Sequence, residues 1–194
     1  MESDNAYKTL LRISKEKNFD LLEKYLQESQ PVKINLSSLP LVEYLSSVIV
    51  SQQVSTKAAK TIWSRVHPII SADINYQNLE TELHSAGLSQ SKASYVIGLI
   101  NNSNLSSLQR SDLKELSNIE FENLLLANKG IGPWSVQMTK IFYLGDTDVM
   151  PINDLGIKHA HEYFFSEHKM SEKFYEPFRP WRTYLTLLMW KSLS

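Results

Sequence analysis

Apolar residues recur every three to four positions through most of the chain, which is the spacing of amphipathic helices. Near the N-terminus they form two sets, one around Leu10 and one around Leu26, separated by the polar residues 14–18. These sets predict two short helices, followed by a connector at 31–40 that holds two prolines. No stretch alternates apolar and polar residues as strands do, so the pattern predicts an all-α fold.

Two further short helices are expected at 76–85 and 92–101. Gly87 suits the end of the first helix, and Ser89 or Ser91 suits the start of the second.

Residues 101–111 are mostly polar and predict turns, and a helix of about ten residues is expected to run to Phe165. In the closing segment 180–190, Trp181 and Trp190 point to opposite sides of a helix. We therefore expect a final helix that is buried on two sides.

The most distinctive stretch is Gly130-Ile131-Gly132-Pro133, which interrupts two apolar helical segments. Both glycines can take the positive φ angles of a tight hairpin, and proline suits the first turn of a helix. A helix that begins in this way presents backbone N–H groups and the positive end of its dipole. We therefore expect Gly130, Ile131 and Gly132 to form a binding site for a phosphate group.

The hairpin is followed about twenty residues later by Val149-Met150-Pro151-Ile152-Asn153-Asp154. Together they resemble the helix-hairpin-helix (HhH-GPD) DNA glycosylase superfamily, and the Gly-Ile-Gly-x-Trp form resembles its 3-methyladenine DNA glycosylase II branch. The resemblance extends over 41–190. It implies one catalytic domain over 1–194, built as two helical lobes with the active-site cleft between them; the chain ends form one lobe and about 41–150 the other.

The resemblance implies that Asp154 is the catalytic residue, because the family places an aspartate at this helix entrance. Breaking an N-glycosidic bond develops positive charge on the sugar, which a fixed carboxylate stabilises. A simple N-cap is the structural alternative, and the two roles are compatible. Asp146 and Asp148 are interpreted as solvated turn residues.

An aromatic pocket would hold a cationic alkylated purine by stacking and cation–π attraction. The resemblance assigns Trp134, Trp190 and Met138 to this pocket: the two tryptophans match aromatic positions of the family, and Met138 replaces a further aromatic residue. Lys191 replaces the aromatic residue that follows the terminal tryptophan in the family. Core packing is an equally good explanation for either tryptophan alone.

A second informative region spans 41–66, where two helices flank Ser51-Gln52-Gln53-Val54-Ser55. Gln53 matches the family position that fills the space left by the extruded base, with Gln52 beside it. The alternative is a polar helix junction in which Ser55 is an N-cap. Lys92 is expected to face phosphate or solvent.

The composition excludes some functions but gives no evidence for DNA binding. Among 194 residues, 20 Lys and Arg oppose 21 Asp and Glu, a net charge of −1, whereas DNA-binding proteins usually carry a basic surface. Contacts through backbone N–H groups need few lysines, however. With no cysteine, disulfides, thiolate catalysis and the cysteine-held iron–sulfur cluster of some bifunctional relatives are excluded.

No metal site and no cofactor are expected, because His159 and His161 lie about 200° apart on a helix. The resemblance does imply a monovalent cation on the hairpin carbonyl groups. No apolar run reaches the roughly 18 residues of a membrane span. We therefore expect an intracellular monomer, in cytoplasm and nucleoid or in a nucleus, without a membrane partner.

Together these features predict a monofunctional DNA glycosylase of base excision repair. Its partner would be double-stranded DNA with alkylated bases, from which it would release purines such as 3-methyladenine and 7-methylguanine after base flipping. Strand cleavage is not expected, because Trp134 stands where bifunctional relatives have a lysine. The alternatives are a non-catalytic helix-hairpin-helix DNA-binding protein and a helical scaffold whose Gly-Ile-Gly is only a loop.

Overall fold

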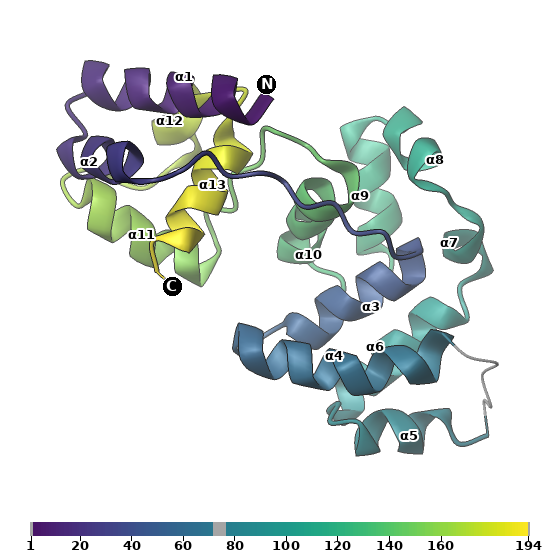
Figure 1. Cartoon of the computed structure of the whole chain (residues 1–194). Helices are drawn as coiled ribbons and strands as arrows, with labels where there is room; N and C mark the ends of the chain where they lie inside the picture. Colours follow the sequence, from purple (N-terminus) through teal and green to yellow (C-terminus); the bar gives the residue numbers. More distant parts are fainter. Residues whose placement is uncertain (1, 72–76, 194) are drawn as a thin grey trace. The chain divides into compact units, whose positions relative to one another are not determined.

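The computed structural model describes residues 2–71 and 77–193, and every regular element in these ranges is helical. The prediction of an all-α fold is therefore confirmed for the described residues. The chain divides into two compact units (Figure 1). Unit 1 comprises 1–36 and 140–194, and unit 2 comprises 37–139. The prediction of a single catalytic domain stays a prediction.

Unit 2 is built around a central apolar helix, α3, which packs against α4, α6, α7 and α10. Leu45, Ile49 and Val50 of α3 are fully buried, which explains why this helix carries apolar residues on nearly all sides. The helices of unit 2 are α3 (Leu41–Ser51), α4 (Thr56–Ser71), α5 (Leu79–Ser85), α6 (Gln90–Ile100), α7 (Ser103–Ser107), α8 (Arg110–Glu115), α9 (Asn118–Leu126) and α10 (Pro133–Thr139).

The ends of α5 and α6 follow the sequence prediction. Gly87 has a φ of +110° just after α5, and the Ser89 side chain accepts a hydrogen bond from the backbone N–H of Lys92 at the start of α6. The expected start of α5 at Tyr76 lies outside the described residues.

The prediction of turns at 101–111 is wrong, because α7 and α8 form there. Caps rather than an apolar face explain these short helices: Asn102 accepts a hydrogen bond from the backbone of Leu105, and a capping box begins α8. Each helix buries a single leucine, Leu105 or Leu113, so no apolar periodicity reveals it.

Unit 1 joins the two ends of the chain around an aromatic core. The ring centroid of Phe165 lies 5.0 Å from those of Phe19 and Phe174, in edge-on packing. The elements of unit 1 are α1 (Glu2–Glu16), α2 (Asp20–Glu28), a π-helical turn (Lys140–Leu144), α11 (Leu155–Phe165), α12 (Glu172–Tyr175), a 3₁₀ turn (Glu176–Phe178) and α13 (Arg182–Lys191).

Helix α13 is buried along most of its length, as its two apolar sides predict. It packs against α11 and α1, so it lies at the centre of unit 1. None of the helices in the described part of the chain has the length and apolarity that a membrane crossing requires.

Candidate active site and DNA-binding hairpin

Asp154 stands at the first turn of α11, in unit 1. Its Oδ1 accepts two hydrogen bonds, one from the backbone N–H of Ile157 at 3.0 Å and one from the indole Nε1–H of Trp190 at 2.9 Å. The first is the N-cap bond that the sequence predicts. The second comes from a different helix, α13, so the carboxylate is fixed against two elements at once.

Trp190 is half-buried and its ring lies nearly parallel to that of Phe142, with centroids 6.1 Å apart. Gly156 permits this arrangement. A Cβ at that position would lie 3.0 Å from Trp190 Cδ1 and 3.1 Å from Asp154 Oδ1, so the indole or the carboxylate would have to shift by a few tenths of an ångström to accept a side chain there. The indole N–H of Trp190 is thus directed at the Asp154 carboxylate.

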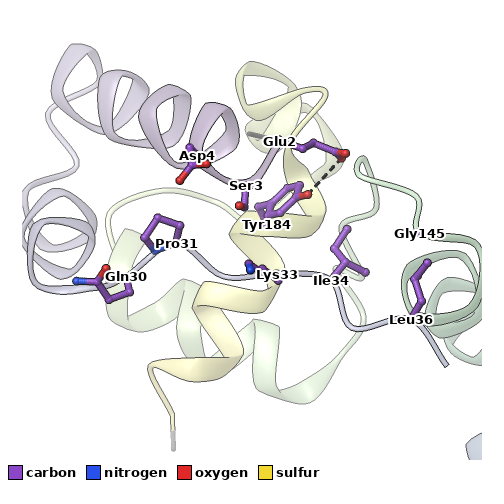
Figure 2. Close-up of a pocket in the computed structure, with 10 residues that line it drawn as sticks. All are labelled: Glu2, Ser3, Asp4, Gln30, Pro31, Lys33, Ile34, Leu36, Gly145 and Tyr184. Atoms are coloured by element: carbon purple, nitrogen blue, oxygen red, sulfur yellow. Dashed lines mark hydrogen bonds between the residues drawn. The ribbon is translucent and has the colours of Figure 1, made fainter. Parts of the chain in front are cut away.

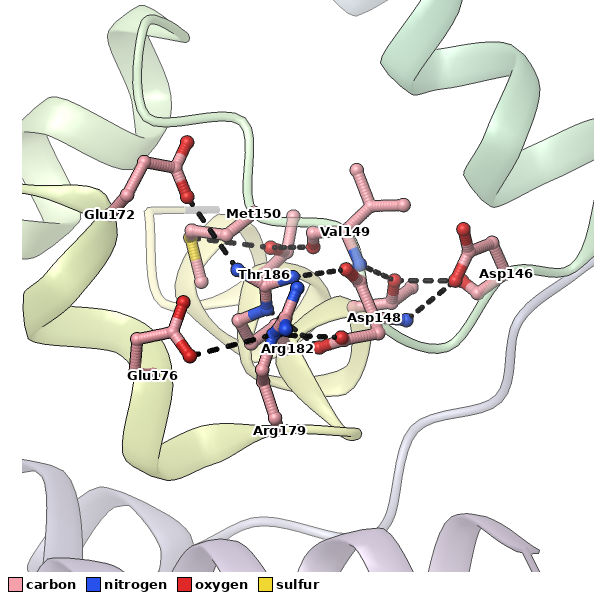
Figure 3. A network of polar contacts seen from close by, with 10 residues as sticks. Asp146, Asp148, Val149, Met150, Glu172, Glu176, Arg179, Arg182 and Thr186 are labelled. Atoms are coloured by element: carbon pink, nitrogen blue, oxygen red, sulfur yellow. Dashed lines mark hydrogen bonds and ion pairs between the residues drawn. The ribbon is translucent and has the colours of Figure 1, made fainter. Parts of the chain in front are cut away.

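The interpretation of Asp148 as a solvated turn residue is wrong, whereas Asp146 does take part in a turn, with its Oδ1 accepting a hydrogen bond from the N–H of Asp148 at 2.8 Å (Figure 3). Both are half-buried, and Asp148 pairs with two arginines: its Oδ1 lies 2.6 Å from Arg182 Nε and its Oδ2 lies 3.1 Å from Arg179 Nε. The carbonyl oxygen of Asp146 accepts a hydrogen bond from the Thr183 hydroxyl at 2.7 Å. These partners are distant in sequence, so local composition gave no sign of them.

In unit 2, the hairpin connects α9 to α10 through a turn in which Gly130 has a φ of +87°. A Cβ on Gly130 would lie 2.4 Å from Cδ2 of Tyr95, so glycine is required there by both backbone and packing. Gly132 differs from the prediction: its φ is outside the left-handed region, and a Cβ would meet no atom within 4 Å. Ile131 between them is buried.

The two adjacent glutamines of the turn between α3 and α4 have different environments. Gln52 Nε2 donates to the carbonyl oxygen of Gly130 at 2.9 Å and to Ser135 Oγ at 3.0 Å, which ties this turn to the hairpin. Gln53 has a φ of +56° and an exposed side chain. Of the predicted pair, Gln53 therefore presents its side chain to solvent, while Gln52 holds the hairpin. Ser55 caps α4, accepting from the N–H of Ala58 at 3.2 Å.

The expectation that Lys92 faces phosphate or solvent is wrong. Its Nζ donates to the carbonyl oxygens of Val50 at 3.0 Å and Gln52 at 2.7 Å, at the end of α3. A cation is favourable at this position because helix C-terminal carbonyl groups carry partial negative charge. Burial lowers the pKa of the Lys92 ammonium below its ordinary value.

The other predicted base-pocket residues lie in unit 2, whereas Asp154 and Trp190 lie in unit 1. Trp134 is half-buried in the first turn of α10. Met138 is only 5% exposed, and its carbonyl oxygen accepts a hydrogen bond from the Tyr44 hydroxyl at 2.8 Å. The grouping of these side chains around a base stays a prediction, as does the hairpin cation.

A groove of about 660 Å³ opens in unit 1, and its lining includes Asp4, Pro31, Lys33, Leu36 and Tyr184 (Figure 2). None of the predicted site residues lines it. Among the described residues, no three histidine, aspartate or glutamate side chains are placed to hold a metal ion.

Sequence reasoning missed Gly156 and the polar residues of α13, among them Arg182. A signal was present for the second group, because arginine and threonine are unusual in a helix expected to be apolar on two sides. Nothing in the residue types indicated which loop they would contact.

Two related proteins have sequences that align with most of this chain. DNA-3-methyladenine glycosylase 1 of Schizosaccharomyces pombe is 29% identical, over 91% of this chain and 82% of its own length. The alkylbase DNA glycosidase-like protein mag2 of the same organism is 28% identical, over 77% of this chain and 76% of its own length.

Solved structures share the fold. The S. pombe 3-methyladenine DNA glycosylase in complex with abasic DNA matches with a TM-score of 0.77 and 24% identity, over 97% of this chain and 96% of that one. A DNA-3-methyladenine glycosidase of Bacillus halodurans matches with a TM-score of 0.72 and 23% identity, over 96% of this chain and 88% of that one.

The family model for the HhH-GPD superfamily of base excision DNA repair proteins matches residues 46–182. That range includes the turn between α3 and α4, the hairpin and Asp154, and it covers more than half of the chain. The protein therefore belongs to the HhH-GPD superfamily of base excision DNA repair proteins.

Proposed function

We propose that this protein is a monofunctional DNA glycosylase that hydrolyses the N-glycosidic bond of alkylated purines in double-stranded DNA. The observation that carries the proposal is the Asp154 carboxylate, held at the start of α11 by the N–H of Ile157 and the indole of Trp190. The names of its relatives, which are 3-methyladenine glycosylases, support the choice of substrate class.

Asp154 would stabilise the positive charge that develops on the sugar as the base departs. Such stabilisation depends on a carboxylate that is already in place and does not reorient during the reaction. The two N–H donors on Oδ1 meet this requirement. An alkylated purine such as 3-methyladenine already carries positive charge, so its departure needs no general acid.

Base flipping would use the surface of unit 2. Gln53 is exposed on a turn whose backbone is held by Lys92 and whose neighbour Gln52 is hydrogen-bonded to the hairpin. A side chain on such a fixed turn can occupy the space of an extruded base and offset part of the unstacking cost. The hairpin would bind a phosphate and so set the register of the duplex, without reading its sequence.

The absence of lyase activity follows from Trp134. Strand cleavage through a Schiff base needs an amine that attacks the sugar. Trp134 takes the position at which bifunctional relatives have that amine, and an indole is not a nucleophile of this kind. The product would be an intact strand with an abasic site.

The decisive experiment is Asp154→Asn. Asparagine also caps helices and can accept both N–H bonds, so the variant should fold like the parent. We expect base release from duplexes containing 3-methyladenine or 7-methylguanine to fall at least about a hundredfold, because a neutral amide cannot offset the charge on the sugar. Binding to the duplex should stay within a few-fold.

Asp20→Asn is the matched control, since Asp20 is an exposed aspartate at the first turn of α2 in the same unit. It should leave base release unchanged. If Asp154→Asn keeps activity within tenfold of the parent, the catalytic assignment fails. If the parent itself releases no base from these duplexes, or from duplexes with 1-methyladenine, hypoxanthine or uracil, a DNA-binding protein without catalysis is the better description.

A further inference from the structure

The segment 146–150, which leads to Asp154, lies along one side of α13 and is hydrogen-bonded to the first turn of that helix (Figure 3). Arg182 Nη2 donates to the carbonyl oxygen of Asp148 at 2.8 Å. The Thr183 hydroxyl donates to the carbonyl oxygen of Asp146 at 2.7 Å and accepts from the N–H of Val149 at 2.9 Å. The Thr186 hydroxyl donates to the carbonyl oxygen of Val149 at 3.1 Å.

These contacts follow the order of both segments. Arg182 and Thr183 hold 146–149, Thr186 holds Val149, and Trp190 holds Asp154. Residues four apart on a helix share one face, so 182, 186 and 190 form a single stripe along α13. We call Arg182, Thr183 and Thr186 the α13 anchor.

The α13 anchor is buried, and its polar groups have hydrogen-bond or ion-pair partners. Thr183 and Thr186 have no exposed surface, and the Arg182 side chain is 8% exposed and paired with the Asp148 carboxylate. Burying an arginine and two hydroxyl groups is costly unless each finds a partner. Here their partners belong mainly to one short loop.

The N-cap bond alone would fix the Asp154 carboxylate only relative to α11. The α13 anchor fixes the preceding loop relative to α13. It therefore sets the position of the Asp154 carboxylate relative to the indole of Trp190. Displacing a reacting group by about 1 Å can cost on the order of a hundredfold in rate. None of the three anchor residues contacts substrate in the proposed mechanism.

We infer that Arg182, Thr183 and Thr186 are positioning residues that hold the Asp154 carboxylate in place through the loop 146–150. The inference rests on the proposed function, because it takes Asp154 as catalytic. It adds three residues, on a different helix, on which the rate of base release depends without any effect on DNA affinity.

The test uses Thr183→Val, which keeps the shape and removes the hydroxyl, with Thr183→Ser as the variant that restores it. Thr186→Val, which loses the hydroxyl contacts to the Val149 carbonyl oxygen at 3.1 Å and to Met150 Sδ at 3.6 Å, is the milder companion if Thr183→Val folds poorly. Ser14→Ala is the matched control: Ser14 is fully buried in unit 1, and its hydroxyl donates to the carbonyl oxygen of Leu11 in its own helix rather than to the loop.

Two measurements are made on each variant. The first is the single-turnover rate of base release at saturating enzyme, together with the dissociation constant for the same duplex. The second is the ¹H–¹⁵N signal of the Trp190 indole, assigned among the four tryptophans with Trp190→Phe. This signal reports the hydrogen bond to Asp154 and does not depend on activity.

We expect Thr183→Val to slow base release by about 10–100-fold, in line with a displacement below or near 1 Å. The dissociation constant should stay within about threefold, and the Trp190 indole signal should move. Thr186→Val should show a smaller loss of the same kind. Thr183→Ser should recover most of the rate, and Ser14→Ala should match the parent in both measurements.

A folded Thr183→Val variant with parental rate and an unmoved Trp190 signal would overturn the inference. Failure of Thr183→Ser to recover the rate would also overturn it, because the role would then belong to side-chain shape. If the parent releases no base, the proposed function fails instead. The indole signal still decides the anchoring in that case: a shift in Thr183→Val supports it, and an unmoved signal refutes it.

Discussion

Replacing Gly130 with alanine is expected to destabilise the protein by about 2–5 kcal/mol, whereas the same change at Gly132 should have almost no effect. Gly130 has a φ of +87°, and an L-residue in that region costs about 1–2 kcal/mol. The added Cβ would also lie 2.4 Å from Cδ2 and 2.9 Å from Cβ of Tyr95. These atoms lie near the base of the Tyr95 side chain, so the whole side chain would have to move. Such overpacking adds about 1–3 kcal/mol.

At Gly132 neither cost arises, because φ is ordinary and no atom lies within 4 Å of the new Cβ. The change in stability should stay within about 0.5 kcal/mol. Thermal unfolding followed by circular dichroism measures the difference, at about 2–4 °C per kcal/mol for a chain of this size. Gly98→Ala is the control: a Cβ there also meets nothing, and alanine in a helix stabilises by about 0.5–1 kcal/mol.

Variants at Gly130 and Gly132 also distinguish a loss of folding stability from a loss of DNA contact. Gly132→Val should fold normally yet bind every duplex about tenfold more weakly, damaged or not, because a side chain would block the approach of a phosphate and carries no base information. Fluorescence anisotropy with damaged and undamaged duplexes measures this. Equal destabilisation by alanine at Gly130 and Gly132 would refute the turn geometry. Parental affinity of Gly132→Val, or a loss confined to damaged DNA, would refute the phosphate contact.

Gln53→Ala should slow base release and reduce the flipped population, read by a fluorescent base analogue, because the space left by the base is no longer filled; unchanged fluorescence would favour a plain helix junction. Lys92→Met should lower the free energy of unfolding in urea by about 1–2 kcal/mol, since two carbonyl groups lose a charged donor, and an unchanged midpoint would contradict this. Burial lowers the pKa of His161, so the unfolded chain takes up a proton first and stability should be lost as pH falls below about 6.5; a variant His161→Phe should lose this part of the pH dependence, and equal slopes would refute it. Borohydride reduction during the reaction should trap no protein–DNA adduct, because Trp134 cannot form a Schiff base, whereas a trapped adduct would show lyase chemistry.

Features set by neighbouring residues could be predicted from the sequence. Asp154 caps the helix that follows it, and Ser89 and Ser55 cap theirs, because each bond joins residues three apart. Gly130 was predictable for the same reason, since a sharp turn between two helices selects glycine. The helices α7 and α8 escaped prediction because caps hold them and each buries a single leucine.

Features that depend on distant partners could not be predicted. Gln52 and Gln53 have identical side chains, but the two side chains point in different directions because Gln53 has a positive φ. The residue type gives no indication of that φ, because non-glycine residues seldom adopt it. Likewise, Asp148 and Arg182 are 34 positions apart, and several charged residues near each would have been equally plausible partners.

Unit 1 is assembled from the two ends of the chain, and this has a consequence for synthesis on the ribosome. Unit 2 is continuous in sequence, so all its helices emerge before α11 and α13 do. Helices α1 and α2 pack against α13 and α11, which leave the ribosome about 7–35 s later at ordinary translation rates of about 5–20 residues per second. Throughout that interval, α1 and α2 can pack on each other but lack the helices that cover the rest of their apolar faces in the folded protein. The nascent chain thus completes unit 2 first, and Asp154 reaches its position only when translation has reached α13.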